Sequence, residues 1–250
     1  MNAVVAESLK LKRSLSWVVV VLLPVVMVAS GSIATLLDGR GLEDGWHTLW
    51  MRSMVFYGLF PLAVGIAILA ALIWRVEHRG SNWNALMAGP TSSLRAVLAK
   101  AGAVAVLAAL MQVIAVATVT ALGTLAFGLP GALPAEYLGV SLLIVVACVP
   151  VAVLQSGLSM LLRSFAAPVA VAFLGAGVSA LLLVGELDAS VLVSPYGAVS
   201  RATQLGTGTF ADTGDIALTT VSLIAVASLV QALVFAAAST TVLERSDTRT

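Results

Sequence analysis

Six long apolar stretches constrain this chain more than any other feature of its sequence. A helix that crosses the hydrocarbon core of a bilayer needs about 20 mostly apolar residues, and it satisfies its own backbone hydrogen bonds in lipid. The stretches therefore predict an all-α integral membrane protein with six transmembrane helices, in which residues 1–250 form a single transmembrane domain. The six stretches are 15–37, 53–74, 99–129, 136–162, 167–185 and 216–243.

The composition excludes a water-soluble domain. The 250 residues are 60% hydrophobic and 10% charged, whereas soluble domains are about 45–50% apolar and about 25% charged. The net charge of +1 gives no broad basic surface, so we expect no nucleic-acid partner. The single cysteine, Cys148, lies within an apolar stretch. We expect it to be a buried structural thiol rather than part of a disulfide or a metal site.

The distribution of Lys and Arg predicts the orientation of the spans. Six spans place both termini on one side of the membrane, and that side carries ten of the 13 basic residues. Basic loops are retained in the cytoplasm, so we expect a multi-pass protein of the cell membrane with both termini in the cytoplasm. The ten are Lys10, Lys12, Arg13, Arg75, Arg79, Arg95, Lys100, Arg163, Arg245 and Arg249, and the other three are Arg40, Arg52 and Arg201.

Residues 1–14 predict a short amphipathic helix at the cytoplasmic interface. Val and Leu side chains alternate with Glu, Lys and Arg in this segment, so that one face can enter the lipid while the basic groups reach the headgroups. The alternative is a basic tail whose only role is to fix the topology.

No motif of a catalytic, cofactor or metal site is present in the sequence. The P-loop that cradles nucleotide phosphates is absent, as are the zinc-protease and serine-hydrolase patterns. We therefore predict no catalytic, cofactor-binding or metal-ligating residue in this chain, and any ATP would be hydrolysed by a separate subunit. Gln112 and Gln155 are amides within predicted spans. They either hydrogen-bond neighbouring helices or line a substrate path.

The longest polar and basic stretch, residues 75–98, joins the second span to the third. Trp74 precedes it, and an interfacial Trp is typical of the end of a span. Within it, Trp83, Leu86 and Met87 have the i, i+3, i+4 spacing of one apolar helix face, and the Gly-Pro pair that follows ends such a helix. The pattern predicts a short helix parallel to the membrane on the cytoplasmic side.

The order Glu77, Trp83, Leu86, Pro90 and Ala99-Lys100 resembles the cytoplasmic loop of ABC type-2 transporter permeases. Among these it is most similar to the six-span permeases of lantibiotic-immunity and bacitracin-resistance exporters. The six-span plan, the cytoplasmic termini and the amphipathic N-terminal helix are also similar to that family. The residues from Glu186 to Asp215 look like the family's outer helical hairpin between spans five and six.

The resemblance implies a permease subunit of an exporter in a bacterial cytoplasmic membrane. Two ABC ATPase subunits, with their own ATP and Mg²⁺, and a second permease, identical or homologous, would complete the transporter within the membrane lipid. The cargo would be an amphipathic peptide or hydrophobic compound, such as an antibiotic. The loop would be a coupling helix seated in the ATPase, with Glu77, Arg79, Trp83 and Leu86 as its contact residues.

Two other functions remain open at the level of the sequence. A membrane enzyme, or the anchor subunit of one, would need a polar cluster at one interface, and the candidate is the outer group of Asp38, Glu43, Asp44, His47 and Arg52. A secondary transporter would need ionisable groups at mid-membrane depth, and no predicted span carries one clearly at that depth. A neighbouring gene for a soluble P-loop protein would favour the permease.

Overall fold

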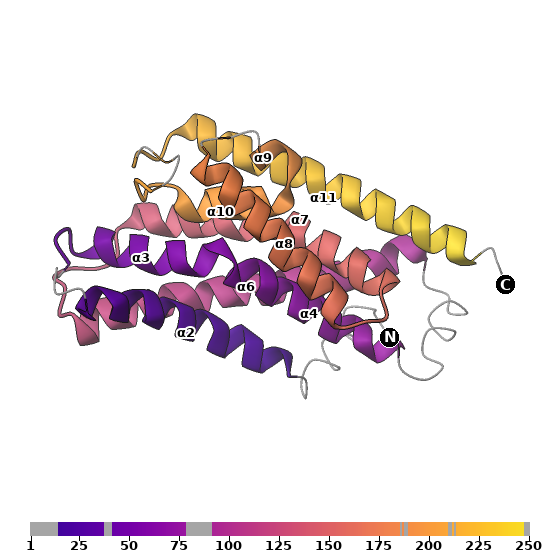
Figure 1. The fold of residues 1–250 in the computed structure, drawn as a ribbon, viewed down its shortest axis with the longest axis horizontal. Coiled ribbons are helices and arrows are strands. Elements are labelled where there is room, and N and C mark those ends of the chain that lie inside the picture. The colour runs from indigo at the N-terminus through magenta and orange to yellow at the C-terminus, as the bar shows by residue number, and fades with distance from the viewer. Residues whose placement is uncertain are drawn as a thin grey trace.

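The computed structural model describes residues 15–37, 42–78, 92–185, 187, 190–209, 212 and 214–247, and all regular structure among them is helical (Figure 1). Six of the helices, α2, α4, α6, α7, α8 and α11, are long and apolar enough to cross a membrane. This confirms the predicted all-α membrane fold. The elements are α2 Ser16–Leu37, α3 Trp46–Leu59, α4 Pro61–His78, α6 Ser93–Ala121, the π-helix η1 Leu122–Ala126, α7 Ala135–Leu161, α8 Ala166–Val184, α9 Ser190–Val193, α10 Pro195–Gln204 and α11 Leu218–Asp247.

The second span differs from the prediction of one continuous helix over 53–74. The predicted stretch is divided between two helices, α3 and α4, which meet at Phe60 and Pro61, and α4 is the one of the two that is long and apolar enough to cross a membrane. Phe60 leaves helical geometry, with φ −134° and ψ −44°. Pro61 then begins α4, since proline has no backbone N–H to donate and is tolerated in the first turn of a helix. The helix α3 begins at Trp46, before the start of the predicted stretch, which the pattern did not indicate because polar Thr48 and Arg52 interrupt the apolar residues of α3.

The polar loop predicted over 75–98 is shorter in the structure. The helix α4 continues through Glu77 to His78, and α6 already begins at Ser93. Both helices therefore extend beyond their apolar stretches and carry charged side chains inside helical segments. The predicted contact residues Arg79, Trp83 and Leu86, and the predicted interfacial helix at 1–14, lie outside the described residues.

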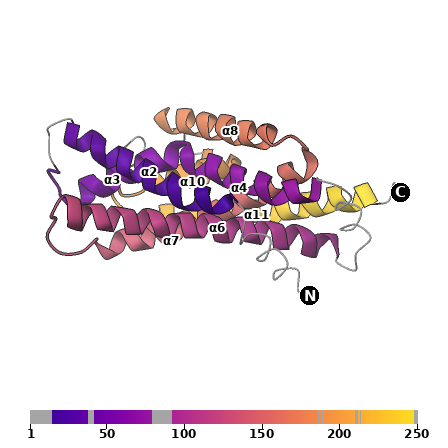
Figure 2. The ribbon, with the colours of Figure 1, turned by 90° about the horizontal axis from the view of Figure 1, so that it is seen from below.

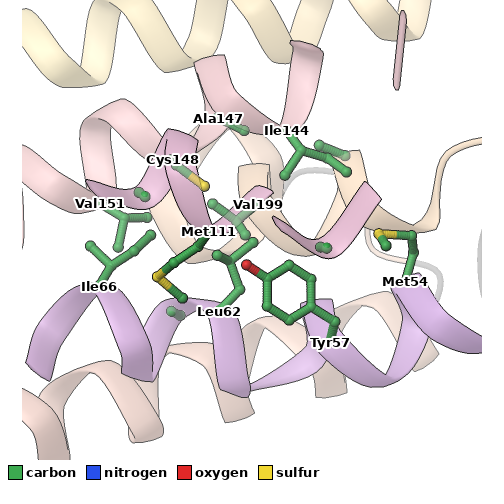
Figure 3. Close-up of a cluster of buried hydrophobic side chains, with 14 of the residues drawn as sticks. Met54, Tyr57, Leu62, Ile66, Met111, Ile144, Ala147, Cys148, Val151 and Val199 are labelled. Carbon is green, nitrogen blue, oxygen red and sulfur yellow. The ribbon is translucent and has the colours of Figure 1, made fainter. Parts of the chain in front are cut away.

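The helix α7 lies at the centre of the bundle and packs against α4, α6, α10 and α11. Figure 3 shows the core around it, where Tyr57 of α3, Leu62 of α4, Met111 of α6 and Val199 of α10 converge on Cys148. Cys148 is a buried free thiol, as predicted. In Figure 2 the helix α8 lies at one flank of the bundle, where about a third of its residues are buried.

The predicted outer hairpin corresponds to α9 and α10, and α10 is inserted into the bundle. Every residue of α10 is buried, and the helix packs against α3, α7, α8 and α11. Gly58 and Gly175 permit this close approach, because a Cβ at either position would overlap a side chain of α10, Thr203 or Tyr196 respectively. A buried ion pair of 2.8 Å between Arg201 and Asp212 fixes the end of α10 to the segment that follows.

The long helices define two ends of the bundle (Figure 1). At one end of the bundle α4, α7 and α11 finish and α2, α6 and α8 begin. We refer to this end as the basic end. Arg75, Arg95, Lys100, Arg163 and Arg245 lie at this end. The opposite end holds the connection 127–134 between η1 and α7.

We expect the basic end to face the cytoplasm, because Lys and Arg are retained on that side during insertion. Two exposed positions test this in a Cys148→Ala background: Ala132→Cys at the opposite end and Ser164→Cys at the basic end. A membrane-impermeant thiol reagent should label position 132 in intact cells and position 164 only after permeabilisation. Labelling of position 164 in intact cells, with position 132 protected, would reverse the topology.

Candidate functional site

The candidate site lies at the basic end, where α4 finishes and α6 begins. Residues 79–91, which carry the predicted coupling motif, connect these two helices. The described residues therefore show how the two flanking helix ends are held. Of the predicted contact residues, Glu77 is the one within the described part of the chain.

Glu77 of α4 forms a buried ion pair with Lys100 of α6. Its Oε1 lies 2.9 Å from the Lys100 Nζ, and the two residues are only 4% and 2% exposed. An isolated charge is costly to bury in a protein or a membrane, and a close opposite charge with a hydrogen bond offsets that cost. The sequence pattern predicted that Glu77 lies in a polar loop, where it would contact a partner protein. The structure places it on the inner face of a helix.

Trp74 covers this ion pair and connects it to a third helix. The Lys100 Nζ lies 4.9 Å from the centre of the Trp74 ring, within the range of a cation–π interaction. The Trp74 indole N–H donates a hydrogen bond of 2.8 Å to the Ser156 Oγ on α7. Trp74 is 1% exposed and lies in the last turns of α4; its position at the membrane interface stays a prediction. Its ring is buried inside the bundle because both its N–H and its π face have partners there.

His78, the last residue of α4, also binds α7. Its Nε2 lies 2.8 Å from the Ser159 carbonyl oxygen, and because a carbonyl can only accept, Nε2 carries the proton. Trp74, Glu77 and His78 have the i, i+3, i+4 spacing of one helix face. This face holds the last turn of α4 against α6 and α7 at once.

A small apolar cluster completes the junction. Trp74 packs with Val97 of α6, Met160 of α7 and Leu243 of α11, all of them buried. Four helices therefore meet directly beside the two ends of the 79–91 segment. The ends of α4 and α6 are thus joined by an ion pair beside a packed cluster.

The two predicted amides lie elsewhere in the bundle. The Gln112 Nε2 donates to the Ser141 Oγ at 3.2 Å, joining α6 to α7. The Gln155 Nε2 donates to the Tyr196 hydroxyl at 2.6 Å, joining α7 to α10. Each carboxamide oxygen is buried without a hydrogen-bond partner among the described residues. Both side chains thus bond neighbouring helices, and their role in a substrate path stays a prediction.

The outer polar group considered for an enzyme is also used to join helices. The His47 Nδ1 lies 2.7 Å from the Tyr137 hydroxyl, and the Tyr137 ring stacks on Trp50 at 4.9 Å between centroids. These contacts fasten α3 to the first turn of α7. Asp38 of the same group lies outside the described residues.

Comparison with known protein families gives a match over most of the chain. The model of the family described as "ABC-2 family transporter protein" matches residues 3–179 of this chain. The matched region covers α2 to α7 and most of α8, and it includes the ion pair and the 79–91 segment. Searches of curated proteins and of solved structures return no match.

The ion pair makes a direct prediction about stability. Lys100→Met leaves the buried Glu77 carboxylate without this counter-charge, so it should lower the free energy of unfolding by about 3–5 kcal/mol. Adding Glu77→Gln to Lys100→Met should recover most of that loss, because no uncompensated charge remains. Thermal unfolding of the three proteins in the same detergent measures the effect. A double variant no more stable than Lys100→Met alone would contradict the buried pair.

Proposed function

Because this chain belongs to the ABC-2 family of transporter permeases, which associate with ABC ATPases, we propose that it is the permease subunit of an exporter and that residues 79–91 form its coupling helix. The observation that carries the proposal is the junction beside that segment. Glu77, Lys100 and Trp74 join the two flanking helices to each other and to α7. Because both flanking helix ends are anchored in this way, a movement of the segment would displace the helices of the bundle rather than bend the segment alone.

The residues of the segment divide into two roles. Trp83 and Leu86 share one apolar face in the sequence pattern, and buried aromatic and aliphatic anchors contribute most of the binding energy in protein interfaces. We assign them, with Arg79, to the ATPase contact. Glu77 is buried against Lys100, so we assign it a positioning role: it holds the helix ends to which the contact residues are attached.

The transporter would contain two ATPase subunits on the cytoplasmic face and a second permease, identical or homologous, beside this one. ATP and Mg²⁺ would bind the ATPase subunits, because this chain has no P-loop. The orientation follows from the basic residues, with the basic end of the bundle toward the ATPase. The exposed apolar side chains of α8 and α11 are available to lipid and to the second permease.

Two observations support a class of cargo: the resemblance of the sequence to lantibiotic and bacitracin exporter permeases, and the apolar composition of the spans. We propose an amphipathic peptide or a hydrophobic compound, of the lantibiotic or bacitracin kind, that is expelled from the membrane. The two buried ion pairs of the described residues, Glu77–Lys100 and Arg201–Asp212, lie at opposite ends of the bundle. Their placement favours structural roles over a proton relay along the spans, which supports a permease driven by ATP rather than by an ion gradient.

ATPase retention tests the proposal. Trp83→Ala should reduce co-purification of the ATPase at least about tenfold, because loss of a central aromatic anchor costs about 2 kcal/mol or more. Leu86→Ala should act in the same direction. The matched control is Trp17→Ala, which removes an exposed Trp from the start of α2 at the same end of the bundle. Wild-type retention by both loop variants, at equal abundance in the membrane, would refute a coupling role for the segment.

A further inference from the structure

We propose that a pocket at the basic end, between α4, α7 and the start of α8, binds the phosphate group of an anionic phospholipid. The pocket has a volume of about 270 Å³. Arg75 and His78 line it from α4, Ser159 from α7, and Arg163 and Phe165 from the connection to α8. It lies beside the ion-pair junction but does not include Glu77 or Lys100.

The charge of the pocket fits a phosphate. Arg75 and Arg163 are both exposed, and neither has an acidic partner among the described residues. Among the residues that the structure describes, no Asp or Glu lines the pocket. A guanidinium group binds phosphate through two parallel N–H bonds, and the pocket has two such groups in its lining.

Neutral donors add to this charge. Ser159 is 2% exposed, and its Oγ has no hydrogen-bond partner among the described residues. The helix α8 starts at Ala166, directly after the lining residue Phe165, and the N-terminus of a helix favours a nearby anion. The C-terminal end of α7, which also borders the pocket, would repel an anion through its free carbonyl groups. This repulsion is reduced because His78 and Leu162 donate hydrogen bonds to two of its last carbonyl groups.

The apolar part of the lining favours a lipid over a soluble anion. Ala71, Leu162 and Phe165 line the same pocket, and the last two are 37% and 43% exposed. A phospholipid brings a phosphate together with glycerol and acyl groups, so it can satisfy the arginines and cover these side chains at once. The pocket also lies at the ends of the spans, where headgroups are found, and basic pockets between transmembrane helices are known lipid sites.

Short-chain lipids test the site with the full-length chain in a neutral detergent. Dihexanoyl phosphatidylglycerol should raise the unfolding temperature at concentrations at least about tenfold lower than dihexanoyl phosphatidylcholine does. Arg163→Gln should weaken phosphatidylglycerol binding roughly fivefold, and Arg75→Gln with Arg163→Gln roughly 25-fold, at about 1 kcal/mol per basic residue. Ser159→Ala should weaken phosphatidylglycerol binding without changing the charge of the pocket.

Arg95→Gln is the matched control, because Arg95 is exposed at the same end of the bundle but does not line the pocket. It should change the affinity less than about twofold. An equal loss from Arg95→Gln and Arg163→Gln would show diffuse surface charge and overturn the site. Equal stabilisation by inorganic phosphate would identify a free-anion site. Loss of a co-purifying ATPase from Arg163→Gln, with lipid binding unchanged, would assign the pocket to a partner's carboxylate.

Discussion

A charge buried among membrane helices needs a close partner, and the pairing of Glu77 with Lys100 meets this need at the junction of the two helices that flank the 79–91 segment. The carboxylate and the ammonium group lie on helices that a polar segment separates in the sequence. Their pairing fixes the register of α4 against α6. Trp74 and His78 then hold the same face of α4 against α7, so the central helix of the bundle is joined to the junction. The packing of the basic end depends on this arrangement.

The spans were predictable because the bilayer requires long apolar helices, and hydropathy reports such helices directly. The break between α3 and α4 was missed, although Pro61 marked it, because the residues on both sides of it remain apolar. The insertion of α10 into the bundle could not be predicted from the pattern of apolar and polar residues in its own sequence. Small residues such as Gly58 and Gly175, which lie on other helices, let it enter the bundle, and close approach between distant segments leaves no local signal.

The site was predicted in part. The motif located the segment and drew attention to Glu77, but it gave no indication that this carboxylate is turned inward. The partner Lys100 lies on the next helix, and pairing across helices depends on rotation and register that a single sequence does not contain. The spacing of Trp74, Glu77 and His78 on one helix face was the available signal, and it pointed to a packed face rather than to a loop. The family match agrees with the motif-based resemblance at the level of the transporter class.

If the ion pair joins the ends of α4 and α6 rigidly, these two ends move as one unit. Spin labels at Val76→Cys and Leu98→Cys, two exposed positions beside the pair, report the separation of the helix ends in a Cys148→Ala background. The distance should show one narrow distribution that ATP and the partner ATPase leave unchanged. It should broaden when Glu77→Gln and Lys100→Met are combined. A wild-type distance that shifts with nucleotide, or a double variant that keeps the narrow distribution, would contradict the claim.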